Sequence, residues 1–420
     1  MAGRLRLAPG GRYLLDEAAA PFFWLADTPW SGPLLSSEED WEQYLADRQR
    51  KGFTVIHCVT TQWRATPASA EGEVAYEGSG PIRINHRFFD RIERRVRAIN
   101  DQGMVAACVL LWDYGPPDRT PGELPERYAV ELASYIVDRL WELDTVWILA
   151  GDGDYTGERA RRWQRIGRQV FEGRDGLVAM HSNSMSWPYD AFEHEPWLHV
   201  WGYQSGHGDD ERTIRWIYSG PPTTRWRELA PHPIINLEPP YEGIRAYQSG
   251  RPHTDYNVRR AVWWSLLSLP PAGVGYGAHG LWSWETEPRV PIEHPNSGVA
   301  PTWREAMALP GSAQMEHLGS LVRSLPWWEL RPAQELLDRQ SERPEGHIAV
   351  AAALDGGLML AYTPLGEGIS LRHTPATAKW FDPRHGTCLP AEVGLDGAYA
   401  PPSREDWVFV AGDESLLPKS

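Results

Sequence analysis

Residues 22–63 read FFWLADTPWSGPLLSSEEDWEQYLADRQRKGFTVIHCVTTQW, in which an amphipathic segment separates two apolar runs. Its first apolar run, 22–27, predicts a strand, and the serine pair followed by acidic residues predicts the start of a helix. Gly52 predicts the end of that helix, because glycine readily adopts the backbone of a helix terminus. A second apolar run, 53–59, follows at once, so the stretch is expected to form one β-α-β unit.

The same alternation of apolar runs and amphipathic segments continues along the chain. Because eight strands alternate with helices, we expect the α/β class and a closed parallel (β/α)8 barrel, also called a TIM barrel. After the first unit, helices are predicted over 88–100, 128–143 and 158–171, and strands over 104–111, 145–149, 177–181, 198–201, 233–237 and 274–284.

Toward the C-terminus the pattern changes to short apolar runs separated by turn residues. Residues 346–362 predict two strands around an Asp-Gly-Gly turn, and 379–381 and 407–410 predict further short strands. We therefore expect a barrel over residues 1–327 and a small antiparallel β-sandwich over residues 328–420. A chain of 420 residues is long enough for both.

The charge balance bears on partners. There are 41 basic and 56 acidic residues, giving a formal charge of −15, and no Lys or Arg run resembles a polyanion-binding surface. Nucleic acid and membrane are therefore not expected as partners. The N-terminus lacks the apolar stretch of a secretory signal, and no apolar run is long enough to span a bilayer, so we expect a cytoplasmic protein. The oligomeric state stays open.

The sequence lacks the usual motifs for binding metals or nucleotides. Cys58, Cys108 and Cys388 lack paired or Cys/His spacing, which argues against disulfides and structural zinc. The histidines are scattered without HExxH or HxH grouping, and neither a GxSxG motif nor a phosphate-binding glycine motif is present. We expect no metal and no cofactor.

Tryptophan is the informative part of the composition. The chain has 22 Trp but only 9 Phe, so indoles in particular are enriched. Indole faces stack on the C–H faces of sugar rings, and the indole N–H can donate to hydroxyl groups. For each single Trp, packing in the core remains an equal alternative.

Two carboxylates follow predicted strands directly. Asp152 ends the fourth strand in WILAGDGDY, and Glu238 ends the seventh in IINLEPPYEG. Strands four and seven lie on opposite sides of an eight-stranded barrel, so both side chains can face one substrate, as hydrolysis of a glycosidic bond requires. Asp152 could instead cap the next helix, and Glu238 could pair with an arginine; Asp154 and Glu242 are the substitutes if the register differs.

Other polar and aromatic residues recur at the carboxyl ends of the predicted strands, where barrel enzymes build their sites. Some of these would bind hydroxyl groups and others would stack on sugar rings, although packing or structural roles remain open for each. The candidates for substrate binding are Asp27, Trp30, Gln62, Trp63, Trp112, Asp154, His181, Asn183, Trp201, Tyr203, Glu242 and Trp282.

Several motifs together resemble a known family. In order, FFWLADTPW, KGFTVIHCV, VWILAGDGD and INLEPPYEG resemble the motifs of the apiosidase-like glycoside hydrolases. Further on, KWFDPRHGT followed by DWVFV resembles the small C-terminal module that is named for collagen binding in the same proteins. The resemblance covers residues of about 5 to 412, which is almost the whole chain.

The resemblance implies a (β/α)8 barrel, a retaining mechanism and plant-polysaccharide substrates such as apiose-containing side chains of pectin. It makes the Asp of the GDGD motif, Asp152, the acid/base and the Glu of NLEPPYEG, Glu238, the nucleophile. We therefore expect an exo-acting retaining hydrolase of a plant- or microbe-derived oligosaccharide or glycoside. A non-catalytic carbohydrate-binding protein on a barrel scaffold and a transglycosidase are the alternatives.

Overall fold

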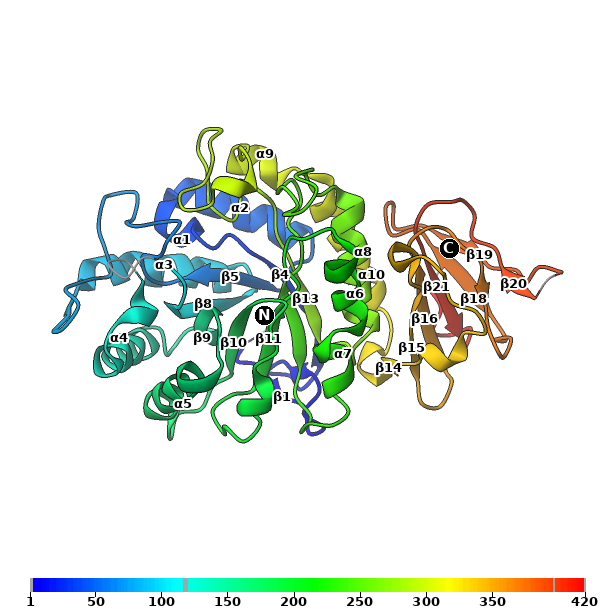
Figure 1. Ribbon diagram of the computed structural model, residues 1–420, viewed down its shortest axis with the longest axis horizontal. Coiled ribbons are helices and arrows are strands. Elements are labelled where there is room, and N and C mark those ends of the chain that lie inside the picture. The colour runs from blue at the N-terminus through cyan, green and yellow to red at the C-terminus, as the bar shows by residue number, and fades with distance from the viewer. Residues whose placement is uncertain (1–2, 116–119, 396, 419–420) are drawn as a thin grey trace.

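The computed structural model describes residues 3–115, 120–395 and 397–418, and its largest unit is a closed parallel barrel (Figure 1). The barrel closes where the last strand pairs in parallel with the first, from Gly273 opposite Trp24 to Tyr276 opposite Asp27. In chain order its strands are β4 (Trp24–Asp27), β5 (Val55–Val59), β8 (Val105–Trp112), β9 (Thr145–Gly153), β10 (Val178–Ser184), β11 (Val200–Gln204), β12 (Ile234–Glu238) and β13 (Gly273–Tyr276). The predicted (β/α)8 fold is confirmed.

Helices surround this barrel and are delimited by the residues that the sequence suggests. In α2 the Ser37 side chain accepts a hydrogen bond from the backbone N–H of Asp40, which satisfies one free donor of the first turn. Acidic residues in that turn and arginines in the last turn oppose the helix dipole. The longer helices are α2 (Glu38–Arg50), α3 (His86–Asp101), α4 (Glu126–Arg139), α5 (Gly157–Phe171), α6 (Glu211–Ser219), α8 (Asp255–Leu267) and α10 (Pro310–Arg323).

The eighth strand is shorter than the predicted range 274–284. Strand β13 ends at Tyr276, and the backbone carbonyl of Ala278 then accepts the N–H groups of Leu281 and Trp282. Gly280 has a φ of 91°, which turns the chain back on itself. The aromatic residues that suggested a continuing strand therefore lie on a buried turn at the carboxyl end of the barrel.

Shorter elements complete the barrel unit. The chain begins with an antiparallel sheet of β1 (Arg6–Leu7), β2 (Leu14–Leu15) and β3 (Pro21–Phe22), and β6 (Tyr76–Glu77) pairs with β7 (Arg83–Ile84) in a hairpin. Short α-helices are α1 (Gly32–Leu35), α7 (Pro221–Arg225) and α9 (Trp303–Met307), and 3-10 turns span Pro121–Glu123, Tyr189–Ala191, Pro295–Ser297, Trp327–Glu329, Gln334–Leu336 and Pro344–Gly346. Among the helices of the described residues, none has the length and apolar character needed to cross a membrane.

A small antiparallel unit follows the barrel. A two-stranded sheet lies over the main six-stranded sheet, and the ring centroids of Tyr399 and Phe409 are 4.7 Å apart between them. Helix α10 ends at Arg323 and this unit begins at Leu330, on either side of the predicted boundary. The main sheet has the order β14 (Leu330–Pro332), β15 (Ala349–Ala353), β16 (Leu358–Thr363), β21 (Trp407–Gly412), β18 (Ala378–Phe381) and β19 (Cys388–Pro390), and the second sheet pairs β17 (Ile369–Ser370) with β20 (Ala398–Tyr399).

The two units pack tightly against each other. Figure 1 shows α8 and α10 on the side of the barrel that faces the small sheet, and apolar residues of both units form one continuous core. Within this interface the guanidinium of Arg259 on α8 forms two hydrogen bonds of 2.6 Å with the carboxylate of Asp406, and both side chains are buried. The Trp264 indole also donates to the backbone carbonyl of His347, at 2.8 Å.

Candidate active site

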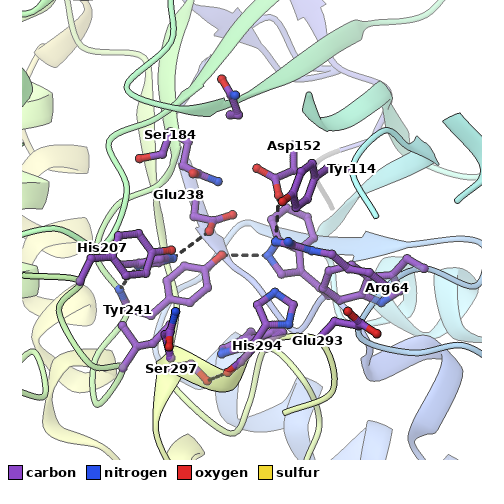
Figure 2. Close-up of a pocket in the computed structure, with 18 of the residues that line it drawn as sticks. Arg64, Tyr114, Asp152, Ser184, His207, Glu238, Tyr241, Glu293, His294 and Ser297 are labelled. Atoms are coloured by element: carbon purple, nitrogen blue, oxygen red, sulfur yellow. Dashed lines mark hydrogen bonds and ion pairs between the residues drawn. The ribbon is translucent and has the colours of Figure 1, made fainter. Parts of the chain in front are cut away.

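A cavity of about 570 Å³ opens at the carboxyl end of the barrel strands (Figure 2). Its walls combine aromatic rings with polar groups, as sites for small hydroxylated ligands commonly do. Among the described residues it is lined by Trp30, Trp63, Trp112, Tyr114, Tyr241, Tyr247 and Trp282, by Arg64, Asp152, Asn183, Ser184, Gln204, His207, Glu238, Glu293, His294, Asn296 and Ser297, and by Ile244 and Pro295.

Glu238 is held in this cavity by two histidines. It is the last residue of β12, and the proline pair that follows cannot continue the ladder of backbone hydrogen bonds. Its Oε1 lies 3.0 Å from Nε2 of His207, and its Oε2 lies 3.3 Å from Nε2 of His181. The Glu238 side chain is only 10% exposed, so little water reaches its carboxylate. The two ring nitrogens are therefore its main polar neighbours.

The backbone fixes which ring nitrogen carries the hydrogen in both histidines. The N–H of Asp152 donates to Nδ1 of His181 at 3.2 Å, and the N–H of Tyr241 donates to Nδ1 of His207 at 3.3 Å. A ring nitrogen that accepts a hydrogen bond is unprotonated, so a neutral ring has its hydrogen on Nε2, facing Glu238. Burial would raise the pKa of Glu238, but the hydrogen bonds from the two histidines outweigh it and hold that pKa well below its usual range.

Asp152 faces the same cavity from the end of β9, across from Glu238 (Figure 2). Its φ of 54° lies in the left-handed region, which aspartate tolerates better than most residues. The flanking glycines fit because a Cβ at Gly151 would meet the Trp112 ring, and a Cβ at Gly153 would meet the carboxylate of Asp113. The chain therefore turns sharply at this point and presents the carboxyl group to the cavity.

The pKa of Asp152 is shifted in the opposite direction to that of Glu238. Burial raises the pKa of the Asp152 carboxyl above its usual range. Arg64, whose Nη2 lies 3.0 Å from Oδ2 of Asp152, opposes this rise, and the negative charge of Glu238 adds to it. One carboxyl group is thus kept ionised while its neighbour across the cavity is shifted toward the protonated form.

The aromatic walls are held in fixed orientations. The ring centroids of Trp63 and Trp112 are 4.4 Å apart, and that of Trp282 is 6.1 Å from Trp63. The Trp30 indole donates to the hydroxyl oxygen of Tyr241 at 2.8 Å. Because these rings are locked by packing and hydrogen bonds, they offer preformed flat surfaces to a ligand.

A second cavity of about 660 Å³ adjoins the first. The two spaces meet along five residues that line both, namely Arg64, Tyr114, Asp152, Asn183 and Glu293. The second cavity is further lined by Asp113, Gly115, Glu123, Gly153, Asp154 and Arg159. Glu238 lines only the first cavity.

Residues 8–329 match the family model described as "Apiosidase-like, catalytic domain". The chain belongs to the apiosidase-like family. It is therefore a glycoside hydrolase, and its substrate is a carbohydrate. Residues 331–412 match a second model, named for a collagen-binding domain of a collagenase. Both matches confirm the resemblance inferred from the sequence motifs.

Solved structures share the fold of this apiosidase-like protein. One named "Glycoside hydrolase" has a TM-score of 0.83 at 22% identity, over 99% of this chain and 98% of its own. A glycoside hydrolase family 5 protein from Bacteroides vulgatus ATCC 8482 also has a TM-score of 0.83, at 20% identity over 100% and 95%. A family 5 mannosidase from Rhizomucor miehei reaches 0.53 at 11% identity, over 76% and 97%. None of the curated proteins matches the chain.

More than half of the predicted site residues of this apiosidase-like protein lie in or directly beside the two cavities. Asp154 lines the second cavity, and His181 lies behind Glu238 with no exposed surface. Within the described part of the chain, no group of three His, Cys, Asp or Glu side chains is placed to hold a metal ion. The first cavity is lined by the predicted residues Asp152, Glu238, Trp30, Trp63, Trp112, Asn183 and Trp282.

Two predicted substrate-binding residues instead face the surrounding helices. Asp27 forms a buried ion pair with Arg48 of α2 and accepts a hydrogen bond from the hydroxyl of Tyr44 at 2.7 Å. Glu242 accepts hydrogen bonds from the Tyr276 hydroxyl at 2.6 Å and from the backbone N–H of Gly311 at 3.0 Å. Both carboxylates form hydrogen bonds or ion pairs with the barrel's own residues and line neither cavity. The expectation that they bind substrate is therefore corrected.

Three further predictions are corrected in the same way. Trp201 is stacked between Tyr189 and His232, with centroid distances of 5.5 and 4.1 Å, and Tyr203 is fully buried. Side chains alternate along a strand, so Trp201 and Tyr203 face outward together while Gln204 faces the cavity. The Gln62 side chain accepts the N–H of Ala75 at 2.8 Å and thereby braces a loop.

The residues that the sequence did not reveal come mostly from loops. Arg64 follows a predicted aromatic residue, and His207 follows the sixth strand in YQSGHG, but neither position belongs to a periodic pattern. Chemical character was their only signal, and it is shared by many residues elsewhere in the chain. Also missed were Tyr114, Ser184, Gln204, Tyr241, Tyr247, Glu293, His294, Asn296 and Ser297.

Proposed function

We propose that this protein is an exo-acting, retaining glycoside hydrolase in which Glu238 is the nucleophile and Asp152 the acid/base. The substrate would be a plant- or microbe-derived oligosaccharide or glycoside. The observation that carries the proposal is that two carboxyl groups line one cavity in different surroundings: two histidines face Glu238, while Asp152 is buried beside one arginine, so their pKa values shift in opposite directions. Glycosidases need one protonated and one ionised carboxyl group at the same time.

The positions of the two groups support the same division of roles. Glu238 lines only the cavity with the aromatic walls, whereas Asp152 lies where the two cavities meet. A general acid has to reach the oxygen between the sugar that is attacked and the group that leaves. The first cavity would then hold the sugar, with the glycosidic oxygen beside Asp152.

In the first step, a carboxylate oxygen of Glu238 forms a bond to the anomeric carbon while the bond from that carbon to the glycosidic oxygen breaks. Asp152 gives its proton to the departing oxygen, so the leaving group departs as a neutral alcohol. In the second step, Asp152 takes a proton from water, whose oxygen attacks the anomeric carbon and releases Glu238. Both groups return to their starting protonation states.

Two features favour retention and exo action. The histidines on Glu238 hold both carboxylate oxygens in place, which suits direct attack by a fixed nucleophile. The first cavity, of about 570 Å³, suits one or two sugar rings better than a long stretch of polymer. Its aromatic walls and largely uncharged polar groups match sugar faces and hydroxyl groups.

The first test is hydrolysis of a panel of para-nitrophenyl furanosides and pyranosides, together with plant-derived oligosaccharides. Wild-type protein should cleave one of these, and Glu238→Gln should not. The anomer of the freshly released sugar, followed by NMR, should match that of the substrate. A product of the opposite anomer would contradict retention, and cleavage inside an oligosaccharide would contradict exo action.

A further inference from the structure

The second cavity differs from the first in its charge. Of the described residues that line it, five are acidic, namely Asp113, Glu123, Asp152, Asp154 and Glu293, and Arg64 and Arg159 are basic. Even with Asp152 protonated, acids outnumber arginines by two. The described lining is therefore negative in either protonation state of Asp152.

Both arginines are already engaged by carboxylates. The Nε and Nη2 of Arg159 donate to the two carboxylate oxygens of Asp113, each at 2.7 Å, and Nη2 also lies 2.7 Å from Oε1 of Glu123. Arg64 donates to Asp152 at 3.0 Å, and its guanidinium lies over the ring of Tyr114. The fork of Arg159 is therefore filled by Asp113, whereas Arg64 forms one hydrogen bond with Asp152, and its buried Nε has no partner in the described part of the chain.

Two of the acids form no ion pair within the described part of the chain. Asp154 and Glu293 are exposed, and neither forms an ion pair or hydrogen bond with another described side chain. Glu293 lines both cavities, and Asp154 lines the second. A carboxylate in such a position accepts hydrogen bonds from sugar hydroxyls but repels an anion. Tyr114, which is 59% exposed, adds an aromatic face at the same junction.

We propose that the second cavity receives the leaving group, and that its negative lining makes the protein select neutral, hydroxylated leaving groups over acidic ones. This inference rests on the proposed roles of Glu238 and Asp152. A leaving group that carries a carboxylate, as a uronic acid does, would approach Asp154 and Glu293 against their charge, and both arginines of the described lining are already paired with carboxylates.

The test uses two aryl glycosides of the sugar that the panel identifies. One carries a 4-nitrophenyl group and the other a 3-carboxy-4-nitrophenyl group, so the leaving groups differ chiefly in the added negative charge. At low ionic strength, wild-type kcat/KM should be about ten-fold higher for the neutral probe than for the acidic probe, and added salt should reduce this ratio. The variant with Asp154→Asn and Glu293→Gln should also reduce the ratio, because its kcat/KM for the acidic probe should rise.

Glu158→Gln is the matched control, because Glu158 lies on α5 outside both cavities and pairs with Arg161. It should leave the ratio between the probes unchanged. Equal rates for both probes in wild type, or a ratio that the double variant leaves unchanged, would overturn the charge selection while the hydrolase assignment stands. Failure to cleave any glycoside of the panel would instead overturn the proposed function and this inference with it.

Discussion

Nε2 of His207 lies 3.0 Å from Oε1 of Glu238, while the opposite nitrogen of the same ring accepts the backbone N–H of Tyr241. The backbone thus sets the direction of the hydrogen bond that the carboxylate receives. His181 is arranged in the same way by the backbone N–H of Asp152. The residue proposed as acid/base therefore orients, through its own main chain, a ring that stabilises the proposed nucleophile.

His207→Phe should make activity more sensitive to acid. Loss of a donor that lowers the pKa of Glu238 raises that pKa, so the carboxylate becomes protonated at a higher pH. The acidic limb of the kcat/KM profile should move to higher pH by about one to two pH units, so activity is lost at a pH where the wild type is still active. His207→Gln, whose amide can still donate, should recover part of the loss, and His86→Gln at an exposed position should change nothing. An unshifted acidic limb in His207→Phe would count against this role.

Glu238→Gln should lower kcat by about 10⁴-fold or more, because the bond to the anomeric carbon can no longer form. Circular dichroism and thermal unfolding should show a folded protein. Glu242→Gln is the matched control, since Glu242 bonds the Tyr276 hydroxyl outside both cavities. Its loss of activity should follow its loss of folded protein, and a catalytic defect as large as that of Glu238→Gln would move the nucleophile to Glu242.

Asp152→Asn should affect substrates according to how much their leaving groups need a proton. For an alkyl or sugar leaving group, kcat should fall by about 10²- to 10⁴-fold, because departure as an alkoxide is unfavourable. A dinitrophenyl glycoside leaves without protonation, so formation of the covalent intermediate should be nearly unaffected. Pre-steady-state release of dinitrophenol measures that step. A uniform loss across leaving groups would exclude Asp152 as the acid.

Arg64→Gln should shift the basic limb of the profile to higher pH. Arg64 lowers the pKa of Asp152, so its removal lets that pKa rise further, and the acid stays protonated at a higher pH. The measurement is kcat/KM against pH for an alkyl glycoside, with the exposed Arg83→Gln as a control of equal charge change. A shift to lower pH would contradict the balance of charges described for Asp152.

Hydrophobic runs and helix boundaries were enough to predict the barrel, the small antiparallel unit and the face that carries the site. Asp152 and Glu238, expected at the ends of two such runs, both line the first cavity, whereas Asp27, expected on the same grounds, does not. The side of the strand on which a residue lies was harder to predict. Successive side chains of a strand point to opposite faces, so an error of one residue in the register moves a side chain from the cavity to the outer face of the barrel. For this reason Trp201 and Tyr203 were expected in the cavity, which Gln204 lines instead.

Loop residues could not be predicted for a different reason. His207 reaches Glu238 from the loop after β11, and Glu293 lies on the long connection between β13 and α9. No periodic pattern governs such segments, since their paths depend on tertiary contacts made far away in the chain. The buried ion pair of Asp27 with Arg48 illustrates the same limit, because only the packed helix shows that this strand-end carboxylate is already neutralised.

Asp406→Asn should lower the free energy of unfolding of the barrel and the small unit together, rather than that of the small unit alone. Asp406 is the buried partner of Arg259 across the interface between the barrel and the small sheet, where apolar residues of both units share one core. Without it the guanidinium is left uncompensated in a buried site, which costs about 3–5 kcal/mol of unfolding free energy. Denaturant unfolding, followed by fluorescence and by loss of hydrolysis, should show both signals shifting together. Glu414→Gln, at an exposed position, is the control, and separate transitions for the two signals would show that the units unfold independently.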